Sequence, residues 1–166
     1  PCCLAGKAAA ESISATLGVP SFPFSHQDGH VTAALYSAGQ MALLEGQTPF
    51  AAFHVSGGTT EVLLVQPREH GLDVSLVGET ADLNAGQAID RVGVMMGLAF
   101  PCGREMEALA ATATQKPPSP RVSVKNGCCN LSGLQNLAEK LWRESGDRAL
   151  VSAFVFSFLA KTLERM

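Results

Sequence analysis

Two histidines four residues apart carry the clearest metal-binding pattern in the chain. His26 and His30 enclose the sequence Gln-Asp-Gly and sit where a helix is expected to begin. Residues at i and i+4 share one helix face about one turn apart, so both imidazoles can bind the same cation. Neutral imidazole suits zinc and ferrous iron, and a carboxylate from elsewhere would complete the site. Two polar residues at an exposed helix start explain the same pattern, and spacing alone favours that simpler explanation.

A serine and two glycines between two apolar segments could bind phosphate. The run is Ser56-Gly57-Gly58-Thr59-Thr60. Glycines let backbone N–H groups turn inward and leave room for phosphate oxygens, while the hydroxyls add donors. Gly-Gly is also an ordinary two-residue hairpin turn, which is the better explanation of this run taken alone.

The remaining polar candidates have structural explanations. Asp82 is predicted to cap the helix that follows it, and Asp90 to lie on a solvated helix face. Cys102 is predicted to be a buried thiol, because no histidine is placed in the sequence to activate it. His54 and His70 have no partner at metal-binding spacing and are interpreted as surface or strand histidines.

These residues must be positioned by several helices and strands, which apolar periodicity and Gly or Pro breaks predict. Three strands between residues 50 and 78 are expected to form an antiparallel meander. The apolar positions of the C-terminal helix have core spacing. A boundary near residues 46–49 separates two parts, 1–47 and 48–166. Helices are predicted over 7–17, 25–44, 83–98 and 132–144 and from 151 onward, and strands over 19–24, 50–55, 59–66, 73–78 and 121–125.

Composition excludes several classes of protein. Hydrophobic residues make up 46% and charged residues 16% of the 166 residues, enough apolar material for a core. The net charge of -3 gives no global attraction to nucleic acid or an anionic membrane, so any RNA contact must be local. The five cysteines fit a reducing compartment, and we find no signal peptide and no membrane-spanning run. We therefore expect a cytoplasmic protein. The missing initial Met and an end inside a predicted helix suggest a piece of a longer chain.

The order of these motifs resembles one family, the tRNA adenosine threonylcarbamoyltransferases (TsaD type), formerly called O-sialoglycoprotein endopeptidases or glycoproteases. The resemblance covers nearly the whole chain. It implies an α/β fold with a mixed sheet, in the ASKHA or actin-like ATPase class with ribonuclease-H-like lobes. Residues 1–47 would be the C-terminal part of the first lobe and 48–166 the N-terminal part of the second. The matching segments are 26–30, 55–60, 78–80, 86–91, 97–98, 101–103 and 130–134.

The resemblance also implies a reaction and its cofactors. The family transfers a threonylcarbamoyl group to the N6 amine of the adenosine next to the anticodon in tRNA, with AMP leaving. One divalent metal, iron or zinc, and either ATP or threonylcarbamoyl-adenylate are the implied cofactors. A further carboxylate ligand of the metal is expected beyond Met166. The implied metal ligands are His26 and His30; the implied nucleotide or substrate contacts are Val55, Ser56, Gly57, Gly58, Thr59, Asp90 and Gly103.

Association is implied as well. Family helper proteins or a paralogue would bind the first-lobe helices, over residues 5–17 and 31–44. A homodimer and a tRNA substrate are further expectations, and no membrane partner is expected.

Several positions depart from the family pattern. Thr59 stands where a histidine is usual, and Cys102 where a glycine is usual. Leu83, Asn84 and Gln87 replace an aspartate, an alanine and a glutamate. These changes suggest a divergent paralogue. One alternative is therefore a catalytically degenerate nucleotide-binding or regulatory partner. A metal-dependent glycoprotease is a weaker alternative, because no His-Glu-x-x-His sequence is present.

Overall fold

The computed structural model describes residues 2–69 and 71–166, which divide into two units. Unit 1 comprises Pro1–Gln47 and Pro67–Leu72, and unit 2 comprises Thr48–Gln66 and Asp73–Met166. The protein is a mixed α/β structure with a small antiparallel sheet. The assignment of residues 1–47 and 48–166 to two lobes of a larger fold stays a prediction.

Unit 1 is mainly helical. The strand predicted over 19–24 is wrong, since this stretch has no regular structure. Pro20 and Pro23 lack the amide hydrogen that a strand would donate, which explains the difference. The single helix predicted over 25–44 is interrupted, because Gly39 adopts a left-handed conformation with φ of 66°. The helices are α1 (Cys2–Leu17), α2 (His26–Ser37) and α3 (Ala42–Glu45).

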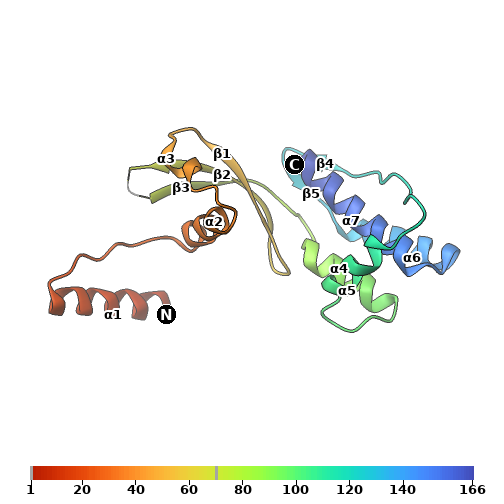
Figure 1. Cartoon of the computed structure of the whole chain (residues 1–166), viewed down its shortest axis with the longest axis horizontal. Helices are drawn as coiled ribbons and strands as arrows, with labels where there is room; N and C mark the ends of the chain where they lie inside the picture. Colours follow the sequence, from red (N-terminus) through yellow and green to blue (C-terminus); the bar gives the residue numbers. More distant parts are fainter. Residues whose placement is uncertain (1, 70) are drawn as a thin grey trace. The chain divides into compact units, whose positions relative to one another are not determined.

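Three consecutive strands form the larger sheet, in the order β1-β2-β3 (Figure 1). They are β1 (Phe50–Val55), β2 (Thr60–Arg68) and β3 (Gly71–Glu79). β1 and β2 pair antiparallel, with a register that runs from Phe50 opposite Val65 to Val55 opposite Thr60. The strands predicted over 50–55, 59–66 and 73–78 are confirmed, although β2 and β3 extend into the loop predicted between them. His70 lies outside the described residues.

Four helices build the core of unit 2 (Figure 1). α7 packs against α5 and α6, and α4 contacts the other three. The predicted core residues of the last helix, from Val151 to Leu159, are buried as expected. The side chains of Val92, Met106 and Leu134 come from the other helices and are fully buried. The helices are α4 (Ala85–Met95), α5 (Gly103–Ala111), α6 (Ser132–Ser145) and α7 (Arg148–Arg165).

Two elements of unit 2 were not expected. α5 begins at Gly103, in a stretch where the sequence predicted no helix. Of the strand predicted over 121–125, only β4 (Val124–Lys125) is present. It pairs with β5 (Cys128–Cys129) in a short hairpin. Asn126 and Gly127 form its turn with φ angles of 51° and 76°. An Asn-Gly pair is the strongest short-range hairpin signal, so this hairpin could have been predicted from the sequence.

None of the helices among the described residues combines the length and the apolar character needed to span a bilayer.

Candidate functional site

The two histidines lie in the first turn and a half of α2, and a capping box fixes this helix start. Ser25 Oγ accepts a hydrogen bond of 3.0 Å from the Asp28 N–H. Asp28 Oδ2 accepts one of 2.9 Å from the Ser25 N–H. Each side chain therefore satisfies a backbone donor that the helix leaves unpaired. The second Asp28 oxygen, Oδ1, is buried and has no hydrogen-bond partner among the described residues.

The imidazoles of His26 and His30 converge. Their Nε2 atoms are 2.9 Å apart, and the rings meet edge to face with centroids 4.4 Å apart. Two nitrogens that bind one zinc ion at about 2.0–2.1 Å each are separated by roughly 3 Å, so the pair fits a shared cation. Both side chains are exposed and thus accessible to an ion. The described residues contain no cluster of three or more His, Cys, Asp or Glu side chains able to hold a metal.

The serine-glycine turn of unit 2 is closed by its own hydroxyl. The N–H groups of Gly58 and Thr59 each donate to Ser56 Oγ at 3.1 Å. The Ser56 N–H donates to the Thr59 carbonyl at 2.8 Å, which completes the turn between β1 and β2. Two amide donors thus point at one oxygen atom. A phosphate oxygen could take the place of this hydroxyl as their acceptor.

The start of α4 holds this turn in place. The Gly86 N–H donates to the Ser56 carbonyl at 3.1 Å. A Cβ atom on Gly86 would lie 2.7 Å from the Gly57 Cα, so only glycine permits this approach. Thr60, which is 2% exposed, accepts from the Ala85 N–H at 2.8 Å through Oγ1. The first amides of α4 are therefore satisfied by the turn and the strand that follows it.

Asp82 has a different role from the one predicted. The cap of α4 is Asn84, which forms a capping box with Gln87. Asp82 Oδ1 instead accepts from Leu131 at 2.8 Å, and Oδ2 accepts from Ser132 at 3.1 Å. The carboxylate thus connects the end of β3 to the N-terminus of α6. Sequence reasoning missed this connection because the partners lie about fifty residues away in the chain.

The pKa of Asp82 reflects these contacts. Partial burial is the largest single influence and raises this pKa. The hydrogen bonds from the Ser132 side chain, from the Leu131 and Ser132 amides and from the Leu83 amide together outweigh it, and they lower the pKa from 3.8 to about 2. The carboxylate is therefore ionised at neutral pH.

An acidic cavity lies beside the serine-glycine turn. Its volume is about 240 Å³. Thr59 lines it, together with the acidic residues Glu61, Glu79 and Asp82. Glu61 also faces His54 across the β1–β2 pair, with Nδ1 and Oε2 3.5 Å apart. His54 is a strand histidine as predicted, with an acidic neighbour. Like charges repel, so a phosphate at the turn would need compensating positive charge.

Asp90 is also not a freely solvated residue. Its Oδ1 atom accepts a 2.8 Å hydrogen bond from the Cys102 N–H and so ties the loop before α5 to α4. Gly103 follows, and a Cβ atom placed there would meet nothing within 4 Å. Cys102 itself is fully buried, as predicted. Burial, followed by the charges of Asp90 and Glu105, raises the pKa of its thiol, which therefore stays protonated.

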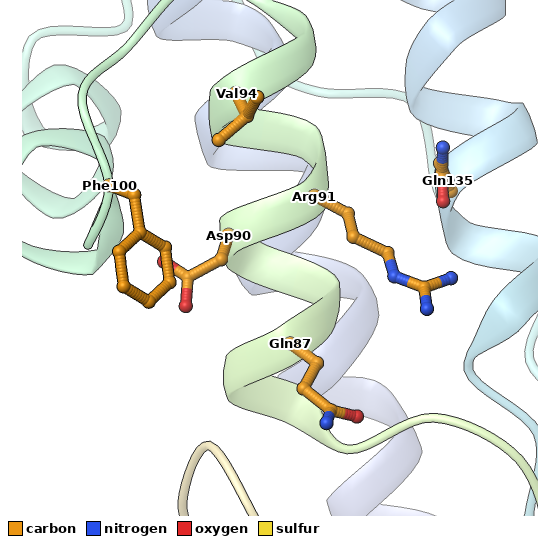
Figure 2. Close-up of a pocket in the computed structure, with 6 residues that line it drawn as sticks. All are labelled: Gln87, Asp90, Arg91, Val94, Phe100 and Gln135. Atoms are coloured by element: carbon orange, nitrogen blue, oxygen red, sulfur yellow. The ribbon is translucent and has the colours of Figure 1, made fainter.

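A second cavity of about 410 Å³ crosses the exposed face of α4 (Figure 2). Figure 2 shows Arg91 reaching from α4 toward the side of α6 that carries Gln135, while Asp90 points to the opposite side of α4, where Phe100 is drawn. Sequence reasoning named Asp90 here but missed Arg91, Phe100 and Gln135 as lining residues. The helical spacing of the lining residues on α4 could have predicted that they share one face. Nothing in the sequence indicated that α6 approaches this face. The lining residues are Gln87, Asp90, Arg91, Val94, Phe100 and Gln135.

The predicted site residues thus form three local groups. His26 and His30 converge in unit 1. The residues from Ser56 to Thr59 form one turn against α4, with Val55 at the end of β1 before it. Asp90 and Gly103 are linked through Cys102.

Comparison with known proteins identifies the family. The family model described as TsaD: tRNA N6-adenosine threonylcarbamoyltransferase matches residues 1–165. A protein of that name from Streptococcus equi subsp. zooepidemicus is 34% identical over 167 residues, covering 97% of this chain and 46% of the relative. One from Streptococcus agalactiae is 34% identical over 166 residues, covering 97% and 47%. One from Streptococcus thermophilus is 38% identical over 122 residues, covering 74% and 34%. The chain spans about half the length of the first two relatives. It belongs to the TsaD family of tRNA N6-adenosine threonylcarbamoyltransferases.

Proposed function

We propose that the protein transfers a threonylcarbamoyl group to the N6 amine of an adenosine in tRNA. The observation that carries the proposal, beside family membership, is the turn from Ser56 to Thr59. Two amides there converge on one oxygen position, and the start of α4 fixes the turn by a hydrogen bond and a glycine contact. Such a preorganised pair of donors suits the phosphate of an adenylate. The wider fold proposed is the two-lobed ASKHA class with ribonuclease-H-like lobes.

In this proposal the residues of unit 2 bind and orient the donor. Gly58 and Thr59 donate their N–H groups to a phosphate oxygen once the Ser56 hydroxyl rotates away. Asp90 keeps its Oδ1 on Cys102 and leaves Oδ2 for a ribose hydroxyl, while the open space above Gly103 admits the nucleoside. The acceptor N6 then attacks the carbamoyl carbon. The bond from that carbon to the phosphate oxygen breaks, AMP leaves, and the amine releases a proton to solvent.

The metal belongs to the proposal as well. His26 and His30 would hold one iron or zinc ion, since their Nε2 atoms already converge. The chemistry that such an ion supplies when bound is Lewis-acid polarisation of a carbonyl or phosphoryl oxygen.

A degenerate nucleotide-binding partner is the second candidate, and two departures from the family pattern favour it. The Thr59 hydroxyl bonds to Ser56 Oγ at 3.0 Å, inside the turn. The Gln87 side chain accepts from the Asn84 N–H at 3.2 Å and completes the cap of α4. Both replacements serve the local structure, as expected if the chain keeps the binding fold without the reaction.

Unit 1 is the proposed contact for a helper protein or a paralogue, or for a second copy in a homodimer. Its helices α1 and α2 expose large apolar side chains: Leu4 is 73%, Leu17 67% and Tyr36 76% exposed. Large apolar side chains left exposed on a helix can form an association surface. The reaction would take place in the cytoplasm, where tRNA is modified.

Metal content, nucleotide affinity and transfer activity together test the function. The wild-type protein is compared with His26→Ala/His30→Ala, and with Gln27→Ala as a control in the same helix turn. We expect stoichiometric iron or zinc that only the double variant loses, ATP affinity that it keeps, and transfer to tRNA that it loses. A metal-free wild type that binds ATP without transferring would support the degenerate partner. A protein that binds neither metal nor nucleotide would overturn both.

A further inference from the structure

Thr60 is a buried threonine directly after the serine-glycine turn. It is almost completely shielded from solvent, and its hydroxyl takes part in two hydrogen bonds. Oγ1 accepts from the Ala85 N–H at 2.8 Å and donates to the Thr59 carbonyl at 2.8 Å. A hydroxyl has a single proton, and here the Thr59 carbonyl receives it. The Thr60 side chain therefore has no donor left for a phosphate, although a hydroxyl in this run could have supplied one.

The carbonyl that Thr60 holds belongs to one of the donor residues of the turn. The Thr59 carbonyl also accepts from the Ser56 N–H at 2.8 Å, so two donors fix its direction. Peptide units are planar, and the Thr59 amide is joined to this carbonyl through a single Cα atom. Holding the carbonyl in place thus limits how far the Thr59 N–H can turn. That N–H is one of the two donors proposed for the phosphate.

The backbone of Thr60 is anchored as well as its side chain. It lies opposite Val55 in the register of β1 and β2, and its carbonyl accepts from the Thr80 N–H at 3.0 Å. Its hydroxyl reaches the first amide of α4, the helix that also contacts the turn through Gly86. Thr60 therefore links the turn to β1, to the end of β3 and to α4. Donors that such contacts fix in advance need little reorganisation when a ligand binds.

We propose that Thr60 is a positioning residue for the phosphate of the adenylate. It acts through Thr59, because its hydroxyl holds the Thr59 carbonyl against the start of α4. The N–H groups of Gly58 and Thr59 are thereby kept aimed at one oxygen position. Thr60 itself does not touch the ligand. The inference rests on the proposed function and deepens it, because it explains how the donor site at the serine-glycine turn keeps its shape.

Paired ligands with and without a phosphate test this role. Binding of AMP and of adenosine is measured by calorimetry for the wild type and for Thr60→Val, in which a methyl group replaces the hydroxyl. Thr60→Val should weaken AMP binding roughly 10-fold, the scale of one hydrogen bond to a charged group, and leave adenosine binding unchanged. Thr60→Ser keeps the hydroxyl and should restore AMP binding. An equal loss for the two ligands would indicate a general disturbance of the fold and overturn the inference.

Thr162→Val is the matched control. Thr162 is equally buried, and its hydroxyl donates to the Phe158 carbonyl at 2.8 Å within α7. Removing that hydroxyl should leave the affinities for AMP and adenosine unchanged. Melting temperatures check that each variant folds.

Thr60→Ala is the second variant, for use if Thr60→Val does not fold. Its smaller side chain leaves room for a water molecule on the Ala85 amide, which Thr60→Val would leave buried and unpaired. It should show the same selective loss of AMP binding. Wild-type AMP affinity in a folded Thr60→Val or Thr60→Ala overturns the inference. Failure of both variants to fold would assign Thr60 to the fold alone and overturn it as well.

The wild type keeps this inference distinct from the proposed function. If the wild type binds AMP more tightly than adenosine and Thr60→Val keeps this preference, the positioning role fails and the phosphate site stands. If the wild type shows no such preference, the phosphate site at the turn fails, and the role of Thr60 with it. If the preference depends on Thr60 but the wild type transfers nothing to tRNA, the proposed function fails and the positioning role stands.

Discussion

At the scale of single residues, one carboxylate organises the junction between the sheet and the helices of unit 2. Asp82 accepts hydrogen bonds from the amides of Leu83, Leu131 and Ser132 and so replaces solvent at the N-terminus of α6. A negative charge there is favourable because the helix end exposes unpaired N–H groups and the positive end of its dipole.

The pH dependence of stability should report this contact. The folded pKa of Asp82 is depressed from 3.8 to about 2, so its contribution is fully present above pH 4 and is lost as pH falls toward 2. Asp82→Asn should lower stability near neutral pH by about 1 kcal/mol, the usual scale for a helix cap. Thermal melts of both proteins from pH 7 to pH 2 should differ at the upper end and converge at the lower.

The matched control is Glu164→Gln, which removes an exposed carboxylate near the end of α7. It should leave the melting temperature unchanged throughout this range. A constant difference between Asp82→Asn and the wild type across the whole pH range would contradict the role of the charge.

At the scale of elements, the contact between α4 and the serine-glycine turn depends on two glycines. An added Cβ atom on Gly86 would lie 2.7 Å from the Gly57 Cα and 2.8 Å from its nitrogen. Both neighbouring atoms are backbone, so neither can rotate away. Gly86→Ala should therefore displace the turn and destabilise the protein by about 1–3 kcal/mol.

Urea denaturation of Gly86→Ala and Gly133→Ala provides the comparison. Gly133 lies in α6, and an added Cβ atom would meet nothing within 4 Å. Its replacement should stabilise the helix by about 0.5–1 kcal/mol, because alanine restricts the unfolded chain. Equal effects at the two positions would mean that the close approach of α4 to the turn does not exist in solution.

At the scale of the whole molecule, the helices α4 to α7 share one hydrophobic core. Leu134 is fully buried there, while Leu137 on the same helix is 44% exposed. Leu134→Ala should cost about 2–5 kcal/mol, because it removes apolar contacts and leaves a cavity. Leu137→Ala should cost less than about 1 kcal/mol, since much of its surface already faces water.

Tryptophan fluorescence measures this difference directly. The chain has a single tryptophan, Trp142, which packs against the same core from α6. Its fluorescence in urea therefore follows the unfolding of unit 2. A loss in Leu137→Ala as large as that in Leu134→Ala would contradict the described core.

The sequence by itself determined the features that depend on near neighbours. The spacing of His26 and His30 placed two imidazoles on one face, and the apolar period of the last helix predicted its buried residues. Both follow from backbone geometry within one or two turns. The motif order also led to the family, which the comparisons show. The Asn126-Gly127 pair, which indicates a hairpin turn and was overlooked, also acts between residues that are close in the sequence.

The tertiary structure alone decided which distant segments meet. Asp82 was predicted to cap the nearest helix, yet it accepts hydrogen bonds from amides near residue 131; Arg91, for which the sequence predicted no role, lines a cavity together with Gln135 on another helix. A carboxylate or a guanidinium can satisfy many partners. Packing of α4 and α6 in the common core selects one of them, and that choice is not encoded in any short segment of the chain.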